Sequence, residues 1–509
     1  MLKRSEYSRG WLMGDVVAAA FGAAVLFGIA VHSTGPGGAT SLGRVLELCA
    51  AAGILFLAWE VPLSIAASGA LLTSTFAGNW QLMGLPSSIG PERVLFAIVL
   101  VRALARTRRR QERVPWSVGH WLLVVLLLYA TASAIWVGTI ETRDGIVLLL
   151  DRLGVIPIAL FALSPVIFRT RVDRSRVLVA LAGLGTYLAF TAWMEMLGIR
   201  GAILPHYISD PSLGYQYGRA RGPFLESVAN GMALFDCGVA AAMLFALSKN
   251  TRTRTTAAAC VAFCASALPL TLTRSIWIGS AVGIAAALVC TPSLRRTALR
   301  FAPAAGVLVL PLVLVGGFST ALQARSSDQF PIWDRINTDA AAIRMIQARP
   351  MLGFGWDTFE AKNAPYFVQT GDTPLSSGVN ATVHNVFLGT AVELGVVGLA
   401  IWVTALLGLF GWIVVHPERG VFTAENKAWR AGTVAVLAQW VVVANLAPLG
   451  YVLPNLVLWL MCGVCWGLLP APAPSRASPG GRRASSTRLR FKLGRGSSGF
   501  GDARPAGAS

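Results

Sequence analysis

Charged residues are scarce in this chain of 509 residues, since Asp, Glu, Lys and Arg together make up only 13% of it. Soluble domains carry about 25% charged residues, and 55% of this sequence is hydrophobic, so we exclude a water-soluble protein. Carboxylate pairs at short spacing are also missing, because no D-x-D, E-x-D or D-x-E occurs. The sequence shows no internal repeat and no globular domain between its apolar segments.

The cysteines offer no disulfide framework and no zinc site. All seven lie in or at the ends of apolar stretches, at positions 49, 237, 260, 264, 290, 462 and 465. The C-x-x-C spacing at 462–465 falls inside one such stretch, where free cysteine behaves as a small apolar residue. We therefore expect neither a bound metal nor another cofactor.

Long apolar runs dominate instead, as in LLVVLLLYA at 122–130. A spanning helix needs about 20 mainly apolar residues, whereas a spanning strand needs alternating polarity over roughly 10. The sequence therefore predicts an all-α, polytopic transmembrane helix bundle of about 12 to 14 spans. The candidate spans are 16–31, 45–59, 61–76, 91–105, 118–138, 146–168, 176–197, 229–247, 255–272, 273–291, 299–318, 385–415, 428–447 and 450–469.

Two of these regions are ambiguous. The stretches 45–59 and 61–76 meet at Glu60–Pro62, so they form either one broken helix or a re-entrant pair. The stretch 385–415 is long, and we expect it to be tilted or bent near Gly398. The basic flank before the first apolar run resembles a signal peptide, but that run is longer than a usual signal core and many spans follow, so we expect an uncleaved first helix.

Arginine and lysine in short loops favour the cytoplasm, and here they gather in the connectors 106–113, 169–176, 248–254 and 293–300. With 14 spans, these connectors and both termini fall on one side, which we expect to be the cytoplasmic side of a bacterial inner membrane. Residues 1–469 form the predicted bundle, and 470–509 are predicted to be a disordered basic cytoplasmic tail, because Pro, Gly, Ser and Arg dominate it. Membrane topology explains most of the net charge of +19, so the charge does not indicate a nucleic-acid partner. Attraction to anionic membrane lipid is an additional effect.

Two long loops fall on the opposite side, at 198–228 and 319–384. The second is the longest polar segment between spans, and loops of that length are usually functional or disordered. The stretch 334–346 has helical periodicity, so we expect this loop to be folded over the membrane surface. PMLGFGWDT at 350–358 follows, with Gly353 and Gly355 suited to tight turns.

Isolated charges gather on the same side. Arg219 and Arg221 lie in the first loop, Arg274 lies in a tight turn between two spans, and His384 closes the second loop. An arginine near the apolar core costs about 2.5–3.5 kcal/mol on insertion scales, and such residues tend to face a cavity and carry function. Taken singly, each arginine could also be a side chain reaching to the interface, and His384 a polar residue at a helix start.

Four motifs in these segments resemble the O-antigen ligase and polymerase superfamily. GRARGPFLESVANGMAL is similar to its R-x-x-G-x-F segment, and TLTRSIWIGSAVGI to its S/T-R-x-x-W-x-G helix start. ARPMLGFGWDTF resembles P-x-x-G-x-G-x-x-F, and HNVFLGTAVELGVVGL resembles H-N-x-x-L-x-x-x-x-E-x-G-x-x-G-L. The resemblance covers about residues 210–415, with the motifs in the family's order and on one side of the membrane.

The resemblance implies a metal-independent glycosyltransferase of the GT-C type, which moves a glycan from an undecaprenyl-diphosphate-linked donor to a glycan, lipid or protein acceptor outside the cytoplasmic membrane. It implies that Arg219 and Arg274 bind the diphosphate, because guanidinium groups bind phosphate oxygens bidentately. Arg221 departs from the family's small residue and is either a third contact or an exposed charge. His384 is the implied general base, and direct attack by the acceptor implies inversion at the anomeric carbon.

Glu393 lies nine residues after His384, about 13 Å along a regular helix, so we expect it to pair with an arginine or a backbone group within the bundle. Two other functions stay open. One is a transporter of small solutes such as bicarbonate, for which Asp151, Arg152, Glu195 and Asp236 supply charges in or near spans. The other is a lipid-linked sugar flippase or scaffold without chemistry. The sequence leaves ligase and polymerase equally open.

Overall fold

The computed structural model describes residues 53, 56–84, 90–110, 114, 116–152, 154–214, 216–295, 323, 329–375, 382–415 and 423–469. Over these residues the all-α prediction is confirmed: the regular structure is helical, and the only strand-like pairing within them is one isolated bridge between Thr370 and Thr373. The predicted first span, the span at 299–318 and the tail at 470–509 lie outside the described residues.

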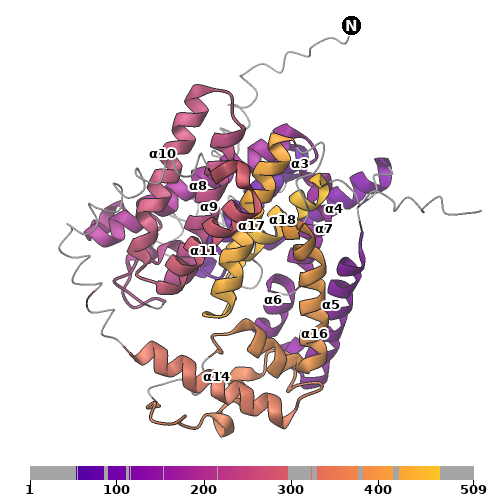
Figure 1. Ribbon diagram of the computed structural model, residues 1–509, viewed down its shortest axis with the longest axis vertical. Coiled ribbons are helices and arrows are strands. Elements are labelled where there is room, and N and C mark those ends of the chain that lie inside the picture. Colours follow the sequence, from indigo (N-terminus) through magenta and orange to yellow (C-terminus); the bar gives the residue numbers. More distant parts are fainter. Residues whose placement is uncertain are drawn as a thin grey trace, which may run out of the picture. The chain divides into compact units, whose positions relative to one another are not determined.

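The helices belong to one compact unit that ends at Leu469 (Figure 1). Several of the described connections contain short 3₁₀ turns. The bounds of the helices are α3 Leu63–Thr73, α4 Pro91–Arg110, α5 Val118–Val137, α6 Arg143–Asp151, α7 Val155–Ile167, α8 Arg171–Leu197, α9 Ser227–Leu247, α10 Thr251–Ala267, α11 Arg274–Cys290, α14 Phe330–Ala348, α15 Phe359–Lys362, α16 Val386–Val415, α17 Ala424–Ala444 and α18 Val452–Leu468.

Within the described part of the chain, five helical segments are long and apolar enough to cross a membrane: α5, Asp144–Ile167, α8, α9 and α16. Three shorter apolar helices add to them, at Leu63–Phe76, Arg274–Cys290 and Val452–Leu468. Predicted spans at 91–105, 255–272 and 428–447 coincide with α4, α10 and α17. A polytopic helix bundle is thus confirmed, whereas the total of about 12 to 14 spans stays a prediction.

Where a helix is interrupted, side chains from other helices bond to the backbone carbonyls that the interruption leaves unpaired. The helical residues 56–60 stop before Pro62, which has no N–H to donate, and α3 starts at Leu63. Arg102 caps the carbonyls left by this break, since its guanidinium donates to Ala58 O at 2.5 Å and Val61 O at 2.8 Å. The predicted span at 146–168 coincides with the candidate span Asp144–Ile167, which consists of the two helices α6 and α7. Gly154 between them is extended (φ −108°, ψ −153°).

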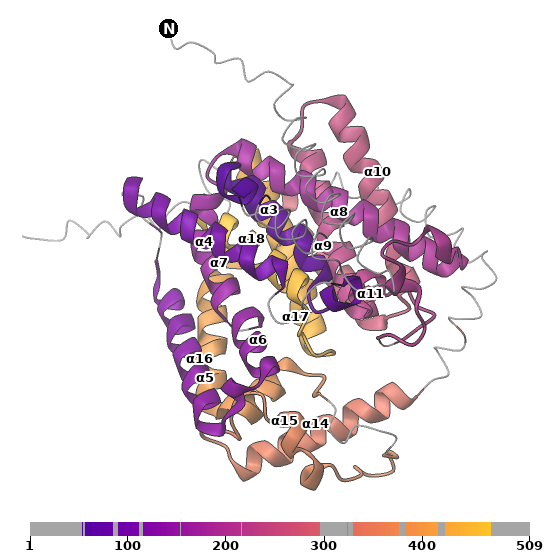
Figure 2. The ribbon, with the colours of Figure 1, turned by 180° about the vertical axis from the view of Figure 1, so that it is seen from behind.

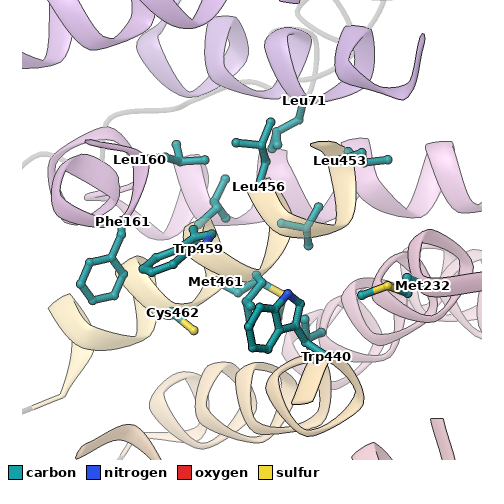
Figure 3. Packing of buried hydrophobic residues seen from close by; sticks show 14 of the residues in the cluster. Leu71, Leu160, Phe161, Met232, Trp440, Leu453, Leu456, Trp459, Met461 and Cys462 are labelled. Atoms are coloured by element: carbon teal, nitrogen blue, oxygen red, sulfur yellow. The ribbon is translucent and has the colours of Figure 1, made fainter. Parts of the chain in front are cut away.

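The hydrophobic core surrounds α18, which is buried along almost its whole length. Figure 3 shows side chains of this helix lying among side chains from α3, α7, α9 and α17; those labelled are Leu71, Leu160, Phe161, Met232, Trp440, Leu453, Leu456, Trp459, Met461 and Cys462. Cys462 and Cys465 are buried free thiols among these apolar residues. Their C-x-x-C spacing thus belongs to helix packing.

Hydrogen bonds between connectors show which of them lie together at each end of the bundle. At one end, which we call the basic end, Arg171 donates to Leu247 O (3.0 Å), Arg174 pairs with Glu425 (2.7 Å) and Arg430 donates to Cys290 O (3.0 Å). The predicted basic connectors 169–176 and 248–254 meet here. The other end, which we call the site end, holds the loop 198–226, the turn 271–273, residues 382–385 and the connector 445–451.

Candidate active site

Two segments that lie about 50 residues apart in sequence are joined at the site end. The N–H of Ala220 donates to Leu270 O at 3.0 Å, and the hydroxyls of Ser227 and Thr273 lie 2.9 Å apart. These contacts place the segment containing Arg219 against the turn that starts α11 at Arg274. Arg274 is exposed at the first position of its helix, and Arg219 is half-buried.

Backbone strain concentrates in the same loops. Among the described residues, four that are not glycine have a positive φ: Gln216 (61°), Leu225 (55°), Leu272 (48°) and Asp357 (57°). Three of them flank the Ala220–Leu270 contact, and the fourth, Asp357, lies in the loop before α15. Residues with side chains rarely adopt this conformation, which costs of order 1–3 kcal/mol and clusters at functional sites.

Arg221 is buried rather than exposed, with 1% of its surface accessible. Its guanidinium donates to the carbonyls of Ile208 (3.0 Å), Asp210 and Leu213, and lies 4.8 Å from the centre of the Tyr217 ring. Burial lowers its pKa, although the nearby Glu195 opposes this effect. Of the two alternatives for Arg221, an exposed charge is therefore wrong, because the guanidinium is buried and bonded to backbone carbonyls of residues 208–213.

His384 lies directly before α16. Its neighbour Asn385 caps the helix, since Asn385 Oδ1 accepts the N–H groups of Phe387 (3.0 Å) and Leu388 (3.1 Å). Nδ1 of His384 is buried and has no hydrogen-bond partner among the described residues. Burial lowers the pKa of His384, the charge of Arg335 on α14 lowers it further, and Asp334 raises it. The imidazole is therefore neutral near pH 7 and can accept a proton.

Three further residues connect this histidine with the first loop, and sequence reasoning missed them. Tyr451, just before α18, has a pKa raised well above its ordinary value by burial, with Glu226 adding to this and the charge of Arg335 opposing it. Burial likewise raises the pKa of Glu226, and Arg219 opposes it. The electrostatic chain thus runs from Arg219 through Glu226, Tyr451 and Arg335 to His384. Arg219 and Glu226 share the motif of the first loop, but Arg335, His384 and Tyr451 lie on three other segments, so the sequence held no signal for the grouping.

Gly353 and Gly355 belong to a second arrangement, a backbone clasp between residues 350–355 and α16. The helix α16 breaks at Gly395 (φ 68°, ψ −178°), three residues before the predicted bend at Gly398. Around the break, Val392 O accepts from Phe354 N (2.8 Å), Glu393 O accepts from Gly355 N (2.9 Å), and Val396 N donates to Pro350 O (2.8 Å). The carbonyl of Leu394 accepts from the Tyr129 hydroxyl (3.0 Å). The interrupted helix therefore keeps its backbone groups paired, as backbone within a membrane must.

Glycine is required on both sides of this clasp. A Cβ on Gly395 would lie 2.0 Å from Met351 O, and one on Gly353 would lie 2.5 Å from Val392 O. Both residues also have a positive φ. The two chain segments approach each other with no room for a side chain between them.

The buried carboxylate of Glu393 completes the clasp. It accepts hydrogen bonds from the backbone N–H groups of Asp357 and Phe359, and the positive charge of Arg152 acts on it. The adjacent Trp356 is fixed by Ser133, which accepts its N–H (3.1 Å), and by Gly145 O, which accepts its indole N–H (3.2 Å). Glu393, Gly353 and Gly355 are thus grouped in one structural unit.

Residues 259–403 match the O-antigen ligase family. The matched segment, described by a family model, covers 145 of the 509 residues (403 − 259 + 1), from α10 to the middle of α16. It contains Arg274, Gly353, Gly355, His384 and Glu393. It begins at residue 259, after the first loop, so Arg219 and Arg221 precede it. No curated protein and no solved structure matches the chain.

The family match confirms, over the residues that it covers, the resemblance drawn from the motifs, and it supports an assignment to the O-antigen ligase and polymerase superfamily. Together with the apolar helices, it supports a membrane protein with a glycan-processing function of the ligase or polymerase type. Such a function implies a lipid-linked glycan and an acceptor as partners.

Proposed function

We propose that this protein is a metal-independent, inverting glycosyltransferase that uses an undecaprenyl-diphosphate-linked glycan as its donor. The observation that carries the proposal is the joining of the 219–227 and 270–274 segments, by the Ala220–Leu270 and Ser227–Thr273 contacts, at the end of the bundle that also holds His384. Two arginines on abutting segments suit a diphosphate, whose oxygens accept bidentate hydrogen bonds from guanidinium groups.

In the proposed reaction, Arg219 and Arg274 bind the diphosphate and stabilise the charge that develops as the bond from the anomeric carbon to the phosphate oxygen breaks. The acceptor hydroxyl attacks the anomeric carbon from the opposite side, and its proton passes to His384. A new glycosidic bond replaces the donor bond, undecaprenyl diphosphate leaves, and the configuration inverts. The lowered pKa of His384 keeps it in the form that accepts the proton at neutral pH.

We assign the other candidates to structure. Arg221 is bound by the carbonyls of its own loop, so we leave it out of the diphosphate set. Glu393, Gly353 and Gly355 hold the clasp in α16. Of the charges considered for a transporter, Asp151 pairs with Arg93 (2.6 Å) and Glu195 accepts from Gly222 N (3.1 Å), so both already have structural partners.

We further propose that the site end faces outward from the bacterial inner membrane and that the basic end and both termini are cytoplasmic. Positive charge in short loops supports this orientation. Labelling of single cysteines introduced at 106–113, in the tail and at Asp372 tests it. Labelling of the tail and of Asp372 from the same side of the membrane contradicts the proposed orientation.

The decisive experiment uses purified protein reconstituted with a lipid-linked donor and a candidate acceptor. We expect glycan transfer that persists in chelator, because no short-spaced carboxylate pair occurs in the sequence. Strict dependence on added magnesium or manganese contradicts metal independence, and uptake of labelled solute into vesicles without transfer supports a transporter instead. Glycan analysis of a deletion strain separates loss of chain length, expected for a polymerase, from accumulation of unattached lipid-linked chains, expected for a ligase.

A further inference from the structure

The helix α14 has an inverted distribution of polar and apolar residues. The face packed against the protein carries Asn337, Thr338, Ala341, Ala342 and Met345, all of them buried, and two of these are polar. Ile332, Ile336 and Ile343 are instead 44%, 41% and 47% exposed. A helix exposed to water normally has the opposite pattern, with its apolar residues against the core.

The three exposed isoleucines form one stripe. Their spacings of four and seven residues place them on a single helix face, opposite the packed face. On one side of the helix, Asn337 donates to Pro374 O (3.0 Å) and Arg344 to Tyr366 O (3.0 Å). On another, Ala342 and Met345 belong to one apolar cluster with Val383, just before α16, and Val392 in its first turns. Neighbouring segments therefore hold the helix on two sides and leave the stripe uncovered within the described part of the chain.

Exposed apolar residues continue from this stripe to a membrane-spanning helix. Met351 and Leu352, just after α14, are 63% and 65% exposed. Their segment is hydrogen-bonded to α16 through Val396 N and Pro350 O, and Val396 is itself 48% exposed. In both views α14 runs across the ends of α5 and α16 rather than alongside them (Figures 1 and 2). This direction suits a helix that lies in the plane of the membrane surface.

We propose that α14 is an interfacial helix whose isoleucine stripe, continued by Met351 and Leu352, lies against the acyl chains of the bilayer leaflet at the site end. Interfacial helices place their apolar face at the boundary between headgroups and chains, and burial of apolar side chains there supplies the binding energy. The contact fixes the height of Asp334 and Arg335, and hence of His384, relative to the lipid surface. The proposal concerns membrane contact alone and does not depend on the transfer chemistry.

Site-directed spin labelling tests this surface. Single cysteines replace Ile336, Ile343, Leu407 or Asp372 in a variant whose native cysteines are replaced by alanine or serine, in nanodiscs of phosphatidylethanolamine and phosphatidylglycerol. Leu407 on α16 is 68% exposed and serves as the lipid-facing control, while the exposed loop residue Asp372 serves as the water-facing control. The measurement is the accessibility of each label to oxygen, which partitions into lipid, and to a water-soluble nickel chelate.

We expect labels at 336 and 343 to resemble the label at 407, with high accessibility to oxygen and low accessibility to the nickel chelate. A pattern like that of 372 shows the stripe in water and overturns the proposal. Labels shielded from both reagents also overturn it, because a protein surface or a second copy then covers the stripe. A size-exclusion profile equal to that of the unlabelled protein shows that each variant is folded.

Discussion

The backbone N–H of Gly355 donates a 2.9 Å hydrogen bond to the carbonyl of Glu393, across the break in α16. Because of this bond and its neighbours, backbone groups of α16 that lack partners within the helix bond instead to the loop before it. Since the Glu393 carboxylate also holds the N–H groups of Asp357 and Phe359, one residue serves both sides of the clasp.

The clasp predicts a strong dependence on glycine at its closest approach. Gly395→Ala places a Cβ 2.0 Å from Met351 O at a residue with positive φ, so we expect a loss of stability of at least about 1–3 kcal/mol. Gly408→Ala and Gly411→Ala in the same helix are matched controls, because a Cβ at either position meets nothing within 4 Å. These should be neutral or stabilise the helix by roughly 0.5–1 kcal/mol. Thermal unfolding of the purified proteins in detergent measures the difference, and equal midpoints for Gly395→Ala and the controls contradict the clasp.

Replacement of His384 by alanine should reduce glycan transfer by about 10²–10⁴, the usual contribution of a positioned acid or base. Membrane abundance and donor binding should be nearly unchanged, because His384 is outside the packed core and the arginines hold the diphosphate. His206→Ala, at an exposed position of the first loop, is the control and should transfer at the wild-type rate. The double variant shows whether His206 substitutes for His384. Wild-type transfer by His384→Ala at normal abundance removes the histidine from the mechanism.

The pH dependence of transfer should follow the charges on α14. Burial and Arg335 lower the pKa of His384 and Asp334 raises it, so the rate should fall as the pH drops through a value below the ordinary pKa of about 6.5. Arg335→Gln should raise the pKa and move this acidic limb to higher pH, while Asp334→Asn should move it to lower pH. Profiles of kcat/KM against pH report the pKa in the free enzyme. Identical acidic limbs in all three proteins rule out the electrostatic link between α14 and His384.

The arginines should separate by role. Arg219→Lys and Arg274→Lys should weaken donor binding and transfer while stability is retained, because a lysine point charge does not reproduce a bidentate fork. Arg221→Ala should instead lower stability by about 1–3 kcal/mol, since it leaves buried carbonyls of the 208–213 loop unpaired. Donor binding and thermal unfolding measured on the same samples distinguish the two effects. A stable Arg221→Ala protein that has lost donor binding reverses our assignment of Arg221.

Hydropathy predicted the helices well because each segment that crosses a membrane must by itself be long and apolar enough to span it. The positions of α5, α8, α9 and α16 follow from local composition. Arg221 shows the limit of such reasoning, because its burial depends on the conformation of residues 208–213. Arg335 shows another limit: periodicity predicted its helix, but its influence on His384 and Tyr451 arises only when three distant segments meet.

The break at Gly395 has a consequence for biosynthesis, because the residues that bond to it come earlier in the chain. As one straight rod, the 30 residues of α16 would extend about 45 Å, well beyond the roughly 30 Å of bilayer hydrocarbon. The ribosome releases residues 350–355 before any part of α16, so the groups that complete the break already exist when Gly395 emerges. In the orientation proposed above, residues 350–355 lie on the outer side of the bilayer, so they can complete the break only after they have been translocated. The final course of this helix therefore depends on a segment outside it, and not on its own hydropathy alone.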